Sequence, residues 1–285
     1  EEVVDVPIIP VKDYSIPCLR ERSLVIAISY SGNTRETLSV VDEALKQGAR
    51  LFCISSGGRL GEICKGGGIP YVEVKGGLTP RAALPLLLYP VAKIFQGTDS
   101  TGKVEKGIEE SKAIIEALRD EVKVNNPFEG NPAKKLASYL FKGFPIIYGS
   151  GLSRSATIRF GTALNENAKI HALTGILPEI CHNDVEGWEV KGEIPFKNVF
   201  LRVPGEPQNI LETFLLLREV IERAGYPVYE VWGRGESLLA KTLSLIYITD
   251  LASLYLAVLR GVEPRPVKII DELKAKFSEG QINQK

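Results

Sequence analysis

Residues 27–37, with the sequence AISYSGNTRET, follow a short apolar run and gather small and hydroxyl-bearing side chains in one turn. A turn between a parallel strand and a helix directs backbone N–H groups and the positive end of the helix dipole toward one point. Ser29, Ser31 and Thr34 add hydroxyl donors there, and Gly32 permits an unusual backbone angle. The stretch therefore predicts an anion-binding loop.

Helix capping is the competing interpretation of the same stretch. Asn33 and Glu36 have the spacing of a capping box, so the polar residues could simply complete the start of a helix. A second loop of similar chemistry, YGSGLS at 148–153, stands at the equivalent position in the other half of the chain. The repetition favours anion binding, although Gly-Ser-Gly alone is a weak signal.

The composition argues against several classes of function. The 285 residues are 44% hydrophobic and 25% charged, which is enough for one large globular domain or two of about 140 residues. Lys plus Arg and Asp plus Glu both number 35, so no net field attracts nucleic acid or an anionic membrane. The cysteines lack C-x-x-C spacing, which fits free thiols in a reducing compartment and supports neither zinc nor a disulfide scaffold.

The location follows from what the apolar stretches contain. No basic and then apolar leader opens the chain, so the cytoplasm is the expected location. The most apolar stretch, 237–259, carries Lys241 and Asp250 and is predicted to be a core helix rather than a membrane span.

The first half of the chain alternates short apolar runs with an amphipathic segment. Buried parallel strands are predicted at 6–11, 23–28, 49–54 and 70–74. Residues 34–48 have apolar positions three and four apart and end at Gly48, which predicts a helix. A longer amphipathic helix is predicted from Ser111, and the polar, turn-rich stretch after it predicts a domain boundary near Asn131.

The second half repeats this plan. Strands are predicted to end at Tyr148 and to cover 198–205 and 227–232, with helices beginning near 153–155 and covering 209–225. We therefore expect two similar α/β domains, at 1–130 and 131–285, each with a doubly wound parallel sheet.

The chain resembles the archaeal-type bifunctional phosphoglucose/phosphomannose isomerases from about residue 6 to the C-terminus. Five motifs occur in the family's order: SYSGNT, SSGGRL at 55–60, TPRAALP at 79–85, NENAKI at 165–170 and ILPEICHNDVEGW at 176–188. The resemblance implies two tandem SIS (sugar-isomerase) domains of flavodoxin-like α/β fold. It also implies a homodimer, no metal or organic cofactor, and aldose–ketose interconversion through an enediol.

The resemblance assigns roles to residues of the first domain. Ser29, Ser31 and Thr34 match the loop that holds the sugar phosphate. Arg81 in TPRAALP matches the arginine that stabilises the enediolate, a task that suits a permanently charged guanidinium with fixed donors. Taken without the family, an arginine between two prolines is more often a surface or capping charge.

Two further roles fall in the second domain. Glu166 in NENAKI matches the base that moves a proton between the carbons of the enediol, although an isolated glutamate at a helix end is usually solvated. His182 matches the histidine that opens the sugar ring, contributed across the dimer interface in relatives, and imidazole suits such proton transfer near neutral pH. His171 matches no family role and is expected to be structural.

The closing segment carries the last assignment. Lys274 in VKIIDELKAKF matches a lysine near the substrate, to which helical periodicity alone would give no special role. The family commonly has threonine and proline, linked to acceptance of both epimers, where this chain reads Val267-Lys268. The resemblance therefore supports glucose 6-phosphate more strongly than mannose 6-phosphate as a substrate.

The first domain departs from the family at its start. Relatives open with a strand and a Gly/Ser-rich loop for which residues 1–22 contain no counterpart, and the chain holds no methionine, even at position 1. We expect that the N-terminal strand and loop of the first domain are lacking from this chain; a degenerate member of the family is the other interpretation.

A sugar-phosphate isomerase is thus the expected function, and two alternatives stay open. One is a non-catalytic SIS sensor that binds a sugar phosphate; retention of Arg81, Glu166 and His182 argues against it, since a sensor needs no base. The other, an amidotransferase-type isomerase, would need a glutamine-hydrolysing domain, which this sequence does not contain.

Overall fold

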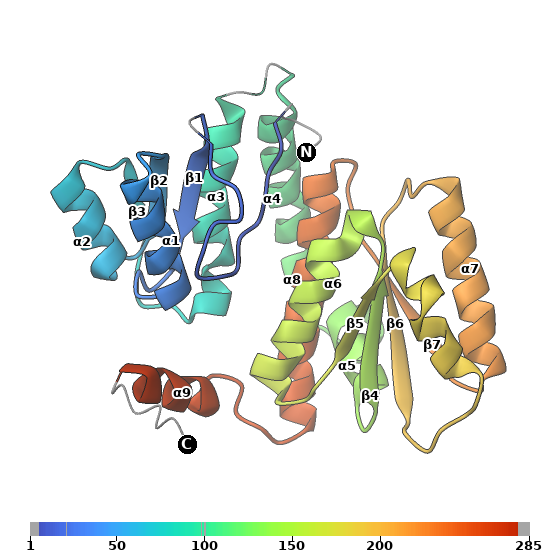
Figure 1. Cartoon of the computed structure of the whole chain (residues 1–285). Helices are drawn as coiled ribbons and strands as arrows, with labels where there is room; N and C mark the ends of the chain where they lie inside the picture. Colours follow the sequence, from blue (N-terminus) through green and yellow to red (C-terminus); the bar gives the residue numbers. More distant parts are fainter. Residues whose placement is uncertain (1–5, 21, 98, 100, 279–285) are drawn as a thin grey trace. The chain divides into compact units, whose positions relative to one another are not determined.

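A computed structural model describes residues 6–20, 22–97, 99 and 101–278 of the chain. The packing divides the chain into two compact units, Glu1–Glu105 and Lys106–Lys285. Each unit contains one parallel sheet with helices beside it (Figure 1). The predicted α/β class with parallel sheets is confirmed.

The first unit is built on a three-stranded parallel sheet of order β1-β2-β3. Its strands are β1 Leu24–Ile28, β2 Arg50–Ser55 and β3 Tyr71–Glu73, and its helices are α1 Arg35–Lys46, α2 Gly58–Gly67, the 3₁₀ turn η1 Pro80–Ala83 and α3 Leu84–Gln96. The core lies between sheet and helices, where Val41 and Ala44 of α1 meet Cys53 of β2 and Leu60 and Cys64 of α2.

Local patterns predicted most of this unit, and one strand prediction is wrong. The strands predicted from 23, 49 and 70 appear as β1, β2 and β3, and Gly48 follows α1 with a φ of 67°. Residues 6–11 form no strand, and Ile9 is 58% exposed. The reason is local, since Pro7 and Pro10 have no N–H to donate to a sheet ladder.

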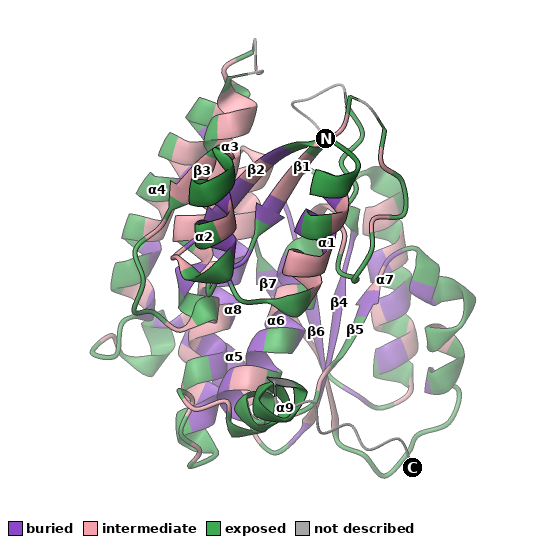
Figure 2. Ribbon diagram, turned by 60° about the vertical axis from the view of Figure 1, so that its left-hand side comes forward, coloured by how far each residue is buried: buried purple, intermediate pink, exposed green. Residues whose placement is uncertain are grey.

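The second unit is built on a four-stranded parallel sheet of order β5-β4-β6-β7. Its strands are β4 Phe144–Gly149, β5 Leu173–Ile176, β6 Phe196–Arg202 and β7 Val228–Trp232. Its α-helices are α5 Pro132–Leu140, α6 Arg154–Ala163, α7 Gln208–Arg223, α8 Leu238–Leu259 and α9 Lys268–Ser278, and short turns lie at η2 Phe128–Gly130, η3 Gly151–Ser153, η4 Leu164–Ala168, η5 Glu179–His182 and η6 Asp184–Trp188. β4 and β6 are buried along most of their length (Figure 2). The sequence patterns did not predict β5, a short strand with two exposed residues.

Helix α8 contributes many buried residues to this unit. By length and composition it could cross a membrane, yet half of its most apolar segment is buried inside the protein. It packs against α5 and α6, and its buried residues include Ala240, Leu245, Ala252 and Leu256. The prediction of a core helix for 237–259 is confirmed.

Helix α4, Lys103–Val122, explains where the chain divides. Glu110 accepts hydrogen bonds from the backbone N–H groups of Glu236 and Ser237 just before α8. The pKa of Glu110 is lowered, first by a hydrogen bond from the Ser237 hydroxyl and then by these backbone bonds. Glu121 forms a two-pronged ion pair with Arg234, at 2.6 and 2.8 Å. These contacts join α4 to the second unit, so the packing divides the chain within the first turn of α4, after Glu105, whereas the predicted boundary at 130/131 lies after this helix. The predicted boundary stays a prediction about the domains themselves.

A buried ion-pair network ties the carboxyl ends of β6 and β7 to the following loop. Arg202 is 2% exposed, and its guanidinium contacts Glu206 at 2.6 Å and Glu230 at 3.0 Å. The same guanidinium lies 4.1 Å from the ring centre of Phe214 and 4.6 Å from that of Trp232. Glu206 also accepts the N–H of Val203, so one carboxylate both pairs with the guanidinium and closes the turn.

Glu206→Gln is expected to destabilise the protein by about 3 to 5 kcal/mol, because the guanidinium of Arg202 would stay buried without its main counter-charge. The measurement is urea unfolding at neutral pH. Glu212→Gln on the exposed side of α7 is the matched control and should change the free energy of unfolding by less than about 0.5 kcal/mol. Equal stabilities of the two variants would show that the network contributes no net stability.

Candidate functional site

The hydroxyl-rich stretch folds as a turn between β1 and α1. Ser29 is 5% exposed, its N–H donates to the carbonyl of Ile54, and its hydroxyl is 2.8 Å from that of Thr34. Ser31 and Thr34 are exposed, and Thr34 is the residue that precedes the first turn of α1. The three hydroxyls therefore cluster at the carboxyl end of the sheet beside a helix N-terminus, where N–H groups lack partners within the helix.

The loop that follows β2 packs against this turn. The N–H of Leu60 donates to the carbonyl of Gly32 at 2.9 Å. A Cβ on Gly32 would lie 1.9 Å from the carbonyl oxygen of Gly57, and one on Gly58 would lie 2.3 Å from that of Ser31. Only residues without side chains allow the two loops to approach so closely.

The predicted capping box is wrong. The side-chain oxygen of Asn33 accepts the N–H of Arg59 at 3.0 Å, and the N-terminus of α1 has no side-chain cap hydrogen bond. The loop after β2 lies close enough for its N–H group at Arg59 to donate to Asn33. Asn33 therefore joins the two loops and does not cap α1.

The similar loop in the second unit uses its hydroxyls internally. Ser150 is 1% exposed and Ser153 is fully buried. The hydroxyl of Ser153 accepts the N–H of Ser150 and donates to the carbonyl of Leu201. The two loops thus differ: the first leaves hydroxyls exposed at the surface, and the second joins β4 to β6.

Tyr30 connects the hydroxyl turn to the segment before Arg81. Its backbone carbonyl accepts bonds from the N–H and hydroxyl of Ser56, and its phenol donates to the carbonyl of Lys75 at 3.1 Å and accepts the N–H of Leu78 at 2.9 Å. Arg81 follows in η1 and is half-buried. A single side chain thus orders the entry to the arginine turn within the first unit.

Glu166 lies in η4, a π-helical turn that extends α6 from Leu164 to Ala168. Such turns widen a helix by one residue and are frequent at functional sites. Its neighbour Asn167 is buried and donates to the hydroxyl of Ser253 on α8 at 2.9 Å. Glu166 itself is half-buried, and the turn that carries it is fastened to α8 through Asn167.

A second carboxylate next to this turn was not found from the sequence. Asp250 on α8 forms a bidentate ion pair with Arg159 on α6, with a shortest distance of 2.6 Å. Burial raises the pKa of Asp250, the ion pair with Arg159 opposes that rise, and the charge of Glu166 adds to it. The sequence signal that could have identified Asp250 was its position as an acidic residue inside the most apolar helix.

The remaining predicted residues lie on three other elements of the second unit. His182 ends the 3₁₀ turn η5 and is exposed, as are its neighbours Cys181 and Asn183. Lys274 is exposed on α9, and His171 is exposed in the segment before β5. Among the described residues, no group of three or more His, Cys, Asp or Glu side chains could hold a metal ion.

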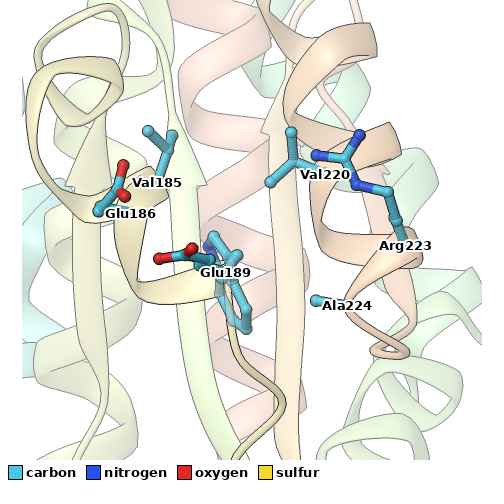
Figure 3. Close-up of a pocket in the computed structure, with 7 residues that line it drawn as sticks. Val185, Glu186, Glu189, Val220, Arg223 and Ala224 are labelled. Carbon is cyan, nitrogen blue, oxygen red and sulfur yellow. The ribbon is translucent and has the colours of Figure 1, made fainter.

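A hollow of the second unit lies away from these residues. It has a volume of about 480 Å³ and lies between η6 and α7, with Glu186 and Glu189 on one side and Val220 and Arg223 of α7 on the other (Figure 3). The predicted site residues do not line it. This hollow is therefore not the place where the predicted chemistry gathers.

Comparison with known proteins gives consistent matches. Residues 129–277 match the bacterial phospho-glucose isomerase C-terminal SIS domain. Curated bifunctional phosphoglucose/phosphomannose isomerases from Caldicellulosiruptor bescii and Aquifex aeolicus are 36% and 34% identical, over 96% and 95% of this chain and 82% and 81% of their own. A crystal structure of a glucose-6-phosphate isomerase like protein from Thermus thermophilus shares the fold, with a TM-score of 0.61 and 23% identity over 95% of this chain and 91% of that one.

Gly32→Ala should destabilise the first unit by roughly 2 kcal/mol or more, because the new methyl group collides with the carbonyl of Gly57 and the φ of 68° favours glycine over alanine. Thermal unfolding and amide hydrogen exchange of residues 29–34 and 55–60 measure the effect. Gly66→Ala in α2 meets no atom within 4 Å and is the control, expected to be neutral or stabilising by up to about 1 kcal/mol. Unchanged exchange in both loops of Gly32→Ala would contradict the close approach.

Proposed function

The chain belongs to the family of bifunctional phosphoglucose/phosphomannose isomerases, and on this premise we propose that it interconverts glucose 6-phosphate and fructose 6-phosphate, with mannose 6-phosphate as a second aldose. The observation that carries the proposal is the identity of 36% with one such enzyme over 96% of this chain. The chain is accordingly a sugar-phosphate isomerase, and a non-catalytic sensor is not favoured.

The phosphate-binding part of the proposal rests on the hydroxyl turn. Ser29, Ser31 and Thr34 hold the 6-phosphate together with the N–H groups at the start of α1. The exposed hydroxyls of Ser31 and Thr34 and the helix dipole support this role, since both favour a bound anion. Binding the phosphate fixes one end of the substrate, so that the reacting carbons take up a defined position.

The proposed chemistry is a proton transfer between neighbouring carbons. His182 moves a proton between the ring oxygen and the C1 hydroxyl, which opens the ring to the aldehyde. Glu166 removes the proton from C2 while the aldehyde oxygen gains a proton, which gives the enediol. Glu166 then returns its proton to C1 while the C2 hydroxyl loses its own, which leaves the ketone at C2. Glucose and mannose 6-phosphates differ only at C2, so both lead to one enediol.

Two cations complete the proposed set. Arg81 stabilises the negative charge that develops on the enediolate oxygens, and Lys274 assists ring opening close to the substrate. The half-buried position of Arg81 in a turn ordered by Tyr30 supports a fixed guanidinium. The place of Glu166 in a turn that Asn167 fastens to α8 supports its role as base, because a carboxylate held at a constant position can meet the C2 proton.

The same proposal covers domains, assembly and location. Two SIS domains stand in tandem, at 1–130 and 131–285, supported by the family match at 129–277 and by a parallel sheet in each unit. The protein is a homodimer in which His182 acts in the partner's site, and the exposure of His182 supports this arrangement. The free cysteines support a reducing, cytoplasmic location.

Glu166→Gln is expected to lower kcat by roughly 10³-fold with little change in KM, because the amide keeps the shape of the side chain but cannot accept the C2 proton. A coupled assay with fructose 6-phosphate, glucose 6-phosphate and mannose 6-phosphate gives the rates. Glu212→Gln on α7 is the control and should keep the wild-type rates. A normal kcat in Glu166→Gln would remove this residue from the mechanism.

Mixing two inactive variants tests the shared site. In a dimer of one Glu166→Gln chain and one His182→Ala chain, one of the two sites keeps both native residues when the histidine crosses the interface. Random reassembly makes half of the dimers mixed, so activity should recover to about one quarter of the wild-type value. No recovery in mixed dimers, when each variant alone is folded and dimeric, would place Glu166 and His182 of one site in the same chain.

A further inference from the structure

Lys169 is a left-handed residue that closes the turn of Glu166. Its φ is 53° and its ψ is 45°, and it directly follows the last residue of that turn, where its N–H donates to the carbonyl of Leu164. A side chain larger than glycine rarely takes this backbone conformation, so a compensating contact is expected for the lysine.

The compensating contacts are three backbone carbonyls. The ammonium of Lys169 donates to the carbonyl of Glu166, to that of Pro266 at 2.6 Å and to that of Pro264 at 3.5 Å. An ammonium has three hydrogen-bond donors, so these three acceptors use its full capacity. None of the three acceptors is an acidic side chain, so these bonds do not form a surface ion pair. They connect two backbone segments through one side chain, and we call this connection a joint.

The carbonyls belong to two segments far apart in sequence. One is that of Glu166 itself. The others lie in the stretch Glu263-Pro264-Arg265-Pro266, which leads into α9 at Lys268. Prolines stiffen this stretch, so a donor that holds its carbonyls also sets where α9 begins.

Arg260 provides an internal comparison. At the end of α8 its guanidinium donates to the carbonyl of Ala168 at 2.9 Å and to that of Lys169 at 3.4 Å. Both of these acceptors belong to the Glu166 turn. The ammonium of Lys169, by contrast, bonds both to this turn and to the proline stretch, and so it joins two elements.

We propose that Lys169 is a positioning residue that fixes the Glu166 turn and the start of α9 against each other, so that Glu166 and Lys274 reach the same substrate. The inference rests on the proposed function, in which these two side chains act on one sugar phosphate. A shift of about 1 Å in a catalytic group can cost about 10²-fold in rate, so a joint of this kind affects turnover without touching the substrate.

Lys169→Gly tests the joint without straining the backbone, since glycine accepts a φ of 53°. Lys142→Gly is the matched control: Lys142 has a φ of 61° in the turn between α5 and β4, and its ammonium lies over the ring of neighbouring Phe141. Lys169→Arg restores donors on the same backbone. All three variants are compared in the full-length protein by thermal unfolding, isomerase kinetics and amide hydrogen exchange.

We expect Lys169→Gly to lower kcat by about 10- to 100-fold and to leave KM within about threefold, because the phosphate is held by another segment. Its amides in residues 265–278 should exchange faster, whereas Lys142→Gly should match the wild type in both measurements. Lys169→Arg should recover part of the lost kcat. A wild-type kcat or unchanged exchange of α9 in Lys169→Gly would overturn the inference.

The inference and the proposed function fail in different ways. If the wild-type protein and Lys142→Gly do not isomerise sugar phosphates, the proposed function fails and the inference falls with it. If both are active and Lys169→Gly is equally active, only the positioning role of Lys169 is wrong.

Discussion

The burial of α8 is the constraint on which the second unit depends. An apolar helix of 22 residues must be covered, and α5 and α6 cover it. Three polar side chains of the helix contact the surrounding elements: Asp250 pairs with Arg159, Ser253 accepts from Asn167, and Tyr255 donates to the carbonyl of Val122. Because a buried polar group needs a partner, each of these contacts fixes the register of a neighbouring element.

The π-helical turn shows how this constraint reaches the chemistry. Glu166 is not itself part of the core. Its neighbour Asn167 is buried and hydrogen-bonded to Ser253 of α8, and the backbone carbonyl of Glu166 accepts a hydrogen bond from Lys169. The backbone around the carboxylate is thus fixed from two sides while the side chain remains half-buried. A proton-transferring carboxylate requires this combination, since its position must be constant and its charge must still be accessible to substrate.

The first unit reaches a defined loop by a different route. Its hydroxyl turn contains no large buried residue. Glycines position this turn, whereas in the second unit contacts with α8 position the turn of Glu166. Gly32 and Gly58 let two loops interlock through backbone and Asn33 contacts, and the Tyr30 phenol extends that order toward Arg81. The result is a rigid backbone with exposed hydroxyls, which is the arrangement that an anion-binding loop needs.

The sequence by itself determined the class of fold, most strands and helices, and the family, because apolar alternation, glycine stops and short motifs are local properties of the chain. The same locality explains the errors. Two prolines cancelled the strand pattern at 6–11, and the Asn33 side chain was taken for a helix cap before its distant partner Arg59 was known. Only the tertiary structure decided the pair of Arg159 and Asp250, which lie 91 residues apart, the internal use of Ser153, and the joint made by Lys169. Such contacts follow from which surfaces the packing brings together, and no local pattern encodes that choice.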